Sequence, residues 1–158
     1  KLVDHIFNTH HQFIYENGPV TAEFINKVAR VHGERHPETV EVAKLFNDLM
    51  QDLHQHMMKE ERILFPYIKQ MVQDSFSNGA FVNGPISVMM AEHDTAGEIL
   101  KKMNALTSGY EPPVDGCNTY RAAYANIQAL EDDIHLHIHL ENNILFPKAL
   151  ELEEQLLG

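Results

Sequence analysis

The stretch HMMKEERILFP, which begins at His56, returns as HIHLENNILFP, which begins at His137, with His, Glu, Ile, Leu, Phe and Pro in the same register. Each copy places a Glu four residues after its first His: Glu60 after His56, and Glu141 after His137. Residues four apart in an α-helix lie on one face, about one turn from each other. Two helices can therefore direct a nitrogen and a carboxylate each toward one interior point, which is how helical bundles build a site for two metal ions.

The repetition of the motif favours a metal site over a pair of solvent-exposed surface residues. A single His and Glu at this spacing is usually a solvent-exposed surface pair, so neither copy alone would indicate a metal site. A surface pair, however, has no need for the same ILFP sequence after it, whereas ligands at a fixed depth need a fixed helix end. We therefore predict that both pairs bind metal. Glu60, and not Glu61, is the predicted bridging residue because the second copy has Asn142 at the position of Glu61.

The chain is also rich in histidine, with 11 His in 158 residues. Buried imidazoles need partners, and one metal site can serve several of them. His93 lies among apolar residues at helical spacing, where it is either a further ligand or a core His bonded to a neighbour. Earlier in the chain, the spacing alone does not choose among five candidates: His5, His10, His11, His32 and His36.

Composition limits the class of protein. With 44% hydrophobic residues and no apolar run near the ~20 residues of a membrane span, residues 1–158 predict one soluble globular domain. The net charge of −11 repels phosphate backbones and anionic lipids, so we expect no nucleic-acid or membrane partner. The single cysteine, Cys117, excludes an intrachain disulfide and favours a cytoplasmic location. The chain opens with Lys1 instead of Met, which suggests that a preceding segment was removed.

The hydrophobic periodicity predicts an all-α protein. Apolar residues at helical spacing predict helices over 1–16, 20–32, 38–73, 85–107 and from about 118 onward. Asn17-Gly18-Pro19 predicts a break within the first helical segment, and Pro66 and Pro147 predict kinks. Four long segments with connections of modest length favour an up-down-up-down four-helix bundle. In that topology the two repeat-bearing helices run parallel and diagonally opposite, so their His and Glu residues face each other.

The two repeats, with GPISVM from Gly84, EHD from Glu92 and PPVDGC ending at Cys117, resemble the hemerythrin-like domain of the RIC (repair of iron centres) family of iron-sulfur cluster repair di-iron proteins. The resemblance covers essentially the whole chain. It implies a hemerythrin-like bundle over residues 1–158, without the N-terminal Cys-containing domain that family members usually carry. Oxygen-carrying hemerythrins have two His on the third helix, where this chain has only His93.

The resemblance also implies a ligand set of five histidines and two glutamates. These residues are His11, His32, His56, Glu60, His93, His137 and Glu141. His11 and His32 are 21 residues apart, or about 31 Å along a straight helix. Both can serve one site only if the chain bends at Asn17-Gly18-Pro19.

The implied cofactor is a pair of iron ions with an oxo or hydroxo bridge, because mixed imidazole and carboxylate ligands suit iron or manganese. This ligand set leaves about one position open for O₂, NO or peroxide. The resemblance implies a stress protein that repairs damaged iron-sulfur clusters, with iron-sulfur proteins as recipients of its iron. A di-iron nitric oxide reductase and an O₂-binding hemerythrin are the alternatives. Glu92 and Asp52 are candidates to line a polar channel to the metals.

Overall fold

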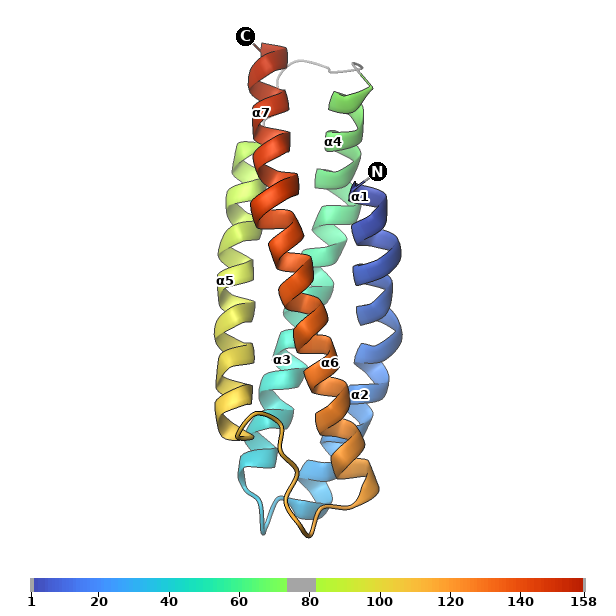
Figure 1. Cartoon of the computed structure of the whole chain (residues 1–158), viewed down its shortest axis with the longest axis vertical. Coiled ribbons are helices and arrows are strands. Elements are labelled where there is room, and N and C mark those ends of the chain that lie inside the picture. The colour runs from blue at the N-terminus through green and yellow to red at the C-terminus, as the bar shows by residue number, and fades with distance from the viewer. Residues whose placement is uncertain (1, 74–81, 158) are drawn as a thin grey trace.

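The computed structural model describes residues 2–73 and 82–157, which form four long helical segments (Figure 1). The first comprises α1 (Leu2–His5), the π-helical turn η1 (Ile6–His11) and α2 (Gln12–His32). The second comprises α3 (Glu38–Lys59), the π-helical turn η2 (Glu60–Leu64) and α4 (Phe65–Val72). The third is α5 (Asn83–Leu106), and the fourth comprises α6 (Asn118–Leu140), the π-helical turn η3 (Glu141–Leu145) and α7 (Phe146–Leu157). Successive segments run in opposite directions, which confirms the predicted all-α, up-down-up-down bundle.

The packing places the two repeat-bearing segments parallel to each other. Both α2 and α5 lie between them, since each contacts α3 on one side and α6 on the other. Beyond the π-helical turns the second and fourth segments meet directly, where α4 contacts α7 at the top of the bundle in Figure 1. The two copies of the repeat therefore enter the same layer of the bundle from the same end.

Each copy of the repeat contains a π-helical turn that begins at its glutamate. These turns start at Glu60 and Glu141. A proline, Pro66 or Pro147, stands two residues after the end of each turn. Proline has no N–H and its ring crowds the carbonyl four residues earlier, so a regular α-helical turn before it is destabilised. A π-helical turn accommodates one extra residue, and such turns are frequent at functional sites. At the two positions where proline predicts a kink, the helix thus has a widened turn that begins with a buried carboxylate.

The predicted break at Asn17-Gly18-Pro19 is wrong, because α2 runs without interruption through Pro19. Gly18 permits a close approach to the second segment, since a Cβ at this position would lie 2.9 Å from the sulfur of Met50. The Asn17 side chain bonds the helix itself, with Nδ2 donating to the carbonyl of Phe13 at 2.9 Å. Of the three residues that signal a turn in sequence, Gly18 therefore serves helix–helix packing, and Asn17 bonds within its own helix.

Two apolar clusters fill the bundle, one on each side of the layer that contains the His and Glu residues. The larger includes Phe46 and Tyr120, and the smaller includes Ile6 and Phe146. On the first segment, for example, Ile6 belongs to one cluster and Ile14 to the other, with His11 between them. The polar layer is therefore enclosed between two hydrophobic cores.

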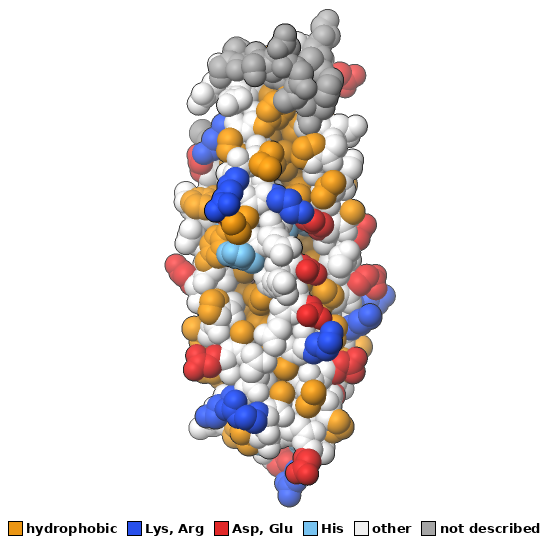
Figure 2. Space-filling view, turned by 180° about the vertical axis from the view of Figure 1, so that it is seen from behind, with side chains coloured by type: hydrophobic (Ala, Val, Ile, Leu, Met, Phe, Trp, Pro, Cys, Tyr) orange, Lys and Arg blue, Asp and Glu red, His pale blue; other side chains and the backbone are white. Residues whose placement is uncertain are grey.

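On the face that Figure 2 shows, the described residues carry charges of both signs. Figure 2 shows acidic and basic side chains distributed over one long face, with small hydrophobic areas between them. Over residues 2–73 and 82–157, none of the helices combines the length and the apolar character needed to cross a bilayer.

We expect Phe46→Ala to lower the free energy of unfolding by about 3–5 kcal/mol, because it leaves a cavity where Phe46 is 0% exposed. Urea denaturation followed by circular dichroism measures this change. Val40→Ala, on the same helix but 54% exposed, is the control and should change the free energy by less than about 0.5 kcal/mol. Equal losses for the two variants would contradict the assignment of the core.

Candidate metal centre

Six buried side chains from all four segments converge in the polar layer. They form two groups, each with ligand atoms within 4.8 Å of one another. One group, which we call the His56 position, consists of His56, His93, Glu60 and Glu141. The other, the His11 position, consists of His11, His137, Glu60 and Glu141. Both glutamates belong to both groups, which is the arrangement that two bridging carboxylates require.

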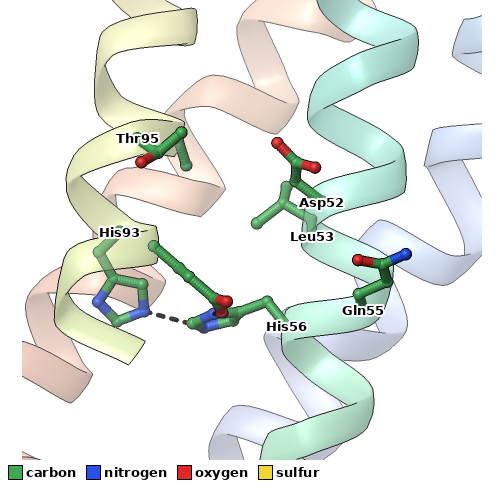
Figure 3. Close-up of a pocket in the computed structure, with 8 residues that line it drawn as sticks. Asp52, Leu53, Gln55, His56, His93 and Thr95 are labelled. Atoms are coloured by element: carbon green, nitrogen blue, oxygen red, sulfur yellow. Dashed lines mark hydrogen bonds and ion pairs between the residues drawn. The ribbon is translucent and has the colours of Figure 1, made fainter. Parts of the chain in front are cut away.

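At the His56 position, two imidazoles point their Nε2 atoms at each other across 3.1 Å (Figure 3). The Nε2 of His93 also lies 2.8 Å from Glu141 Oε1, and that of His56 lies 3.4 Å from Glu60 Oε2. Two nitrogens and two carboxylate oxygens thus surround one point.

The His11 position uses the other oxygen of each carboxylate. The Nε2 of His11 lies 3.1 Å from Glu60 Oε1, and the Nε2 of His137 lies 2.9 Å from Glu141 Oε2. His137 Nε2 is also 3.8 Å from Glu60 Oε1. Glu60 and Glu141 therefore each direct one oxygen to each position.

The donor set fits metal ions. Glu60 and Glu141 are both 0% exposed, and no Lys or Arg is among the six residues. Glu60 Oε2 and Glu141 Oε1, one from each bridge, accept no hydrogen bond from the described residues, although the Nε2 atoms of His56 and His93 lie 3.4 and 2.8 Å from them. Buried acceptors without partners are costly unless a cation satisfies them. Imidazole with carboxylate suits iron, manganese or zinc, and two such ions would serve all eight donor atoms.

Protonation of the metal-free cluster follows from burial. Burial, and then the positive charge of protonated His137, lower the pKa of His11 to about 3. Burial and the charge of Glu141 raise the pKa of Glu60 well above its usual value. Burial alone would also raise the pKa of Glu141, but the imidazole of His137 outweighs it and lowers that pKa. In the metal-free site these shifts favour a neutral His11 and the protonated form of Glu60, so a metal ion competes with protons for Glu60.

The residue that follows each bridging glutamate is hydrogen-bonded to the Nδ1 atom of a ligand candidate. His11 Nδ1 lies 2.8 Å from Glu61 Oε2, and His93 Nδ1 lies 2.8 Å from Asn142 Oδ1. An acceptor at Nδ1 keeps the proton there and leaves Nε2 free for a metal. From the sequence, Glu61 and Asn142 served only to identify the bridging residues, and their own contacts were not predicted. The repeat contained the signal for their role, because each follows its bridging glutamate directly.

His56 has an acidic partner at the mouth of a cavity. His56 Nδ1 lies 2.7 Å from Glu92 Oε1, whose other oxygen accepts from Lys59 Nζ at 2.6 Å. A cavity of about 200 Å³ opens between α3 and α5 beside His56 and His93 (Figure 3). Asp52 and Glu92, the two acids predicted from sequence to line a channel, both line this cavity.

The structure does not bring His32 to the other six predicted residues. Because α2 is continuous, His32 lies at the far end of the helix from His11, and its Nε2 lies 3.3 Å from Cys117 Sγ. His36 is also remote and pairs with Asp115 at 3.1 Å. The bend that a shared site would need at Pro19 is absent from the described helix.

His10 is buried close to the cluster but is not part of either group. Its Nδ1 lies 2.9 Å from Asp133 Oδ1, and its ring stacks on that of His137 with 5.8 Å between centroids. Of the five histidines that the spacing left open, only His11 directs a nitrogen at a bridging glutamate.

We expect the chain to bind about two divalent ions, and His11→Ala to lose the ion at the His11 position because two of its four donors are imidazoles. Elemental analysis of protein loaded anaerobically with Fe²⁺ measures the stoichiometry. His32→Ala, the control, should keep full loading. A loss of metal from His32→Ala equal to that from His11→Ala would contradict the separation of His32 from the centre.

The stability of the metal-free protein should depend on His11 between pH 6.5 and about pH 3. In this range the folded state keeps His11 neutral while the unfolded chain takes up a proton, so this group lowers the free energy of unfolding as the pH falls. Glu60 acts in the opposite sense because its pKa is raised. Comparing urea denaturation of the wild type with His11→Gln isolates the His11 contribution, and the wild type should lose more stability on acidification. Parallel curves for the two proteins would contradict a depressed His11 pKa.

Comparisons with known proteins agree with this geometry. Residues 2–149 match the family described as "Hemerythrin HHE cation binding domain". The chain is 43% identical over 150 residues to proteins named "Iron-sulfur cluster repair protein YtfE" from Enterobacter sp. (strain 638) and from Citrobacter koseri. Each of these matches covers 95% of this chain but 66% of the relative, so the chain spans just under two thirds of their length. Since the family match extends over nearly the whole chain and its cation-binding description fits the buried cluster, the chain belongs to the hemerythrin HHE cation-binding domain family.

Proposed function

We propose that the chain holds two iron ions, joined by an oxo or hydroxo bridge, and supplies iron for the repair of iron-sulfur clusters damaged by nitric oxide or oxidants. The observation that carries the proposal is the pair of adjacent positions that share Glu60 and Glu141, one of them beside an open cavity. The proteins from Enterobacter and Citrobacter koseri that resemble this chain are named for iron-sulfur cluster repair.

The charge of the donor set supports a site that can give up its metal. Four neutral imidazoles and two carboxylates supply only two negative charges for two divalent ions. Ligand charge is one of the main determinants of how tightly a hard cation is held. A thiolate-rich site would be closed and tight, whereas this one suits exchangeable iron.

The cavity supports a route for an iron ion to leave. It borders His56 and His93, and the carboxylates of Asp52 and Glu92 line it. Glu92 both lines the cavity and is hydrogen-bonded to His56, so it connects the cavity to a ligand candidate. Carboxylates along the way lower the cost of moving a cation out of a buried site.

Reduction of nitric oxide is the second candidate function. It is favoured by the same cavity, which admits a small molecule to the His56 position, and by the proximity of the two metal positions. Bound iron would supply the electrons for such chemistry. The protein would contribute a shielded cavity and the fixed imidazoles.

Transfer of iron to a metal-free iron-sulfur protein tests the proposal. Protein loaded with Fe²⁺ should restore the cluster of a small apo-ferredoxin in the presence of sulfide and reductant, and the visible absorption of the cluster reports the rate. We expect Glu92→Gln to slow the transfer several-fold at equal iron loading, because it removes one charge from the cavity. Glu98→Gln, an exposed change elsewhere on α5, is the control.

Separate assays of the same Fe²⁺-loaded protein, with NO and with O₂, distinguish the candidate functions. Production of N₂O from added NO, without iron transfer, would favour the reductase. A stable reversible O₂ adduct without either activity would indicate a hemerythrin-type carrier.

A further inference from the structure

We propose that Tyr15 is a positioning residue for the His11 position: through Glu61 it holds the His11 imidazole in place, so that this position releases its metal more slowly than the His56 position. The inference rests on the proposed metal centre and assigns different properties to its two halves.

A single oxygen atom joins the three residues. The hydroxyl of Tyr15 donates to Glu61 Oε2 at 2.8 Å, and His11 Nδ1 donates to the same oxygen at 2.8 Å. Tyr15 and His11 are four residues apart, at the start of α2 and the end of η1, so both lie on the helix face toward the second segment. The hydroxyl therefore fixes the carboxylate that in turn fixes the imidazole.

The arrangement determines which nitrogen of His11 carries the proton. An ionised carboxylate only accepts hydrogen bonds, so Nδ1 must be the donor. Nε2 is then left with its lone pair, and it points at Glu60 Oε1 from 3.1 Å. Without the hydroxyl, the Glu61 side chain, which is 22% exposed, is free to turn toward solvent and His11 loses its acceptor.

Neighbouring aromatic rings pack against both Tyr15 and His11. The Tyr15 ring meets the His54 ring edge-on, with 5.8 Å between centroids. The His11 ring stacks on Phe65, with 5.6 Å between centroids and 22° between planes. These contacts leave the hydrogen bonds to Glu61 as the feature that selects the His11 tautomer.

The outer partners of the two positions differ in charge. At the His56 position, Glu92 lines the cavity and forms an ion pair with Lys59, and these two side chains are 35% and 44% exposed. At the His11 position, Glu61 has no Lys or Arg ion pair among the described residues and is bonded by a neutral phenol. An uncompensated carboxylate behind an imidazole makes it a more basic ligand. The fixed orientation of the His11 imidazole and its greater basicity both favour slower release of metal at the His11 position.

The test compares Tyr15→Phe with Tyr67→Phe. Tyr15 is partly buried, so Phe keeps the ring and removes only the hydroxyl. Tyr67 is a matched control because its hydroxyl also donates to a carboxylate, Glu153 Oε2 at 3.2 Å, but beyond the π-helical turns. Thermal unfolding of the metal-free variants verifies that both fold.

Release of Fe²⁺ to excess ferrozine is the first readout. The wild type should release iron in two phases of equal amplitude. In Tyr15→Phe the slow phase should become about 10-fold faster while the fast phase is unchanged. Tyr67→Phe should match the wild type. An unchanged slow phase in Tyr15→Phe, or equal acceleration in both variants, would overturn the proposal.

The second readout needs no metal. Long-range ¹H–¹⁵N correlation spectra of the metal-free protein report which ring nitrogen of each histidine is protonated. We expect His11 to be protonated at Nδ1 in the wild type and Tyr67→Phe, and to become a mixture of tautomers in Tyr15→Phe. Unaltered His11 signals in Tyr15→Phe would refute the positioning role. Altered signals in a protein that binds no iron would uphold the role of Tyr15 and refute the proposed function instead.

Discussion

The rest of the structure depends on the burial of two carboxylates with no Lys or Arg among the residues that surround them. Glu60 and Glu141 are fully enclosed, and their nearest partners are imidazoles. Taking a carboxylate out of water costs several kcal/mol unless a cation or a set of hydrogen bonds compensates. In the metal-free protein the same burial raises the pKa of Glu60, which favours its uncharged form. A pair of bound cations removes this cost more completely, because every oxygen of both carboxylates then has a partner.

The architecture is organised around this polar layer. A hydrophobic cluster on each side holds the four segments in register, so the ligand candidates from all of them arrive at the same depth. The π-helical turns add a local adjustment at three of the six residues: His11 ends one turn, and Glu60 and Glu141 begin the other two. Each widened turn changes the direction of a side chain without interrupting the helix, since the helical segments continue on both sides. Rigid packing above and below the layer thus supports an irregular backbone within it.

The near two-fold relation between the repeats does not extend to the surroundings of the two metal positions. Glu61 and Asn142 occupy equivalent places after the bridging glutamates, yet one is a charged acceptor and the other a neutral one. The cavity with Glu92 and Lys59 lies beside the His56 position, whereas the Tyr15–Glu61 contact backs the His11 position. The two positions therefore have similar donor sets but different surroundings, and this difference is the basis of the unequal metal release proposed above.

Sequence alone determined the elements that follow from periodicity and repetition. Helical spacing of apolar residues predicted the bundle, and the repeated His-x₃-Glu motif predicted the core of the ligand set, because residues four apart on a helix must share a face. Only the tertiary structure decided what local signals leave ambiguous. Asn17-Gly18-Pro19 reads as a turn, but a proline can be kept within a helix when neighbouring packing compensates, and α2 therefore carries His32 away from the centre. The choice among the crowded histidines, the roles of Glu61 and Asn142, and the Tyr15 contact depend on which side chains meet across helices, and no spacing along one helix contains that information.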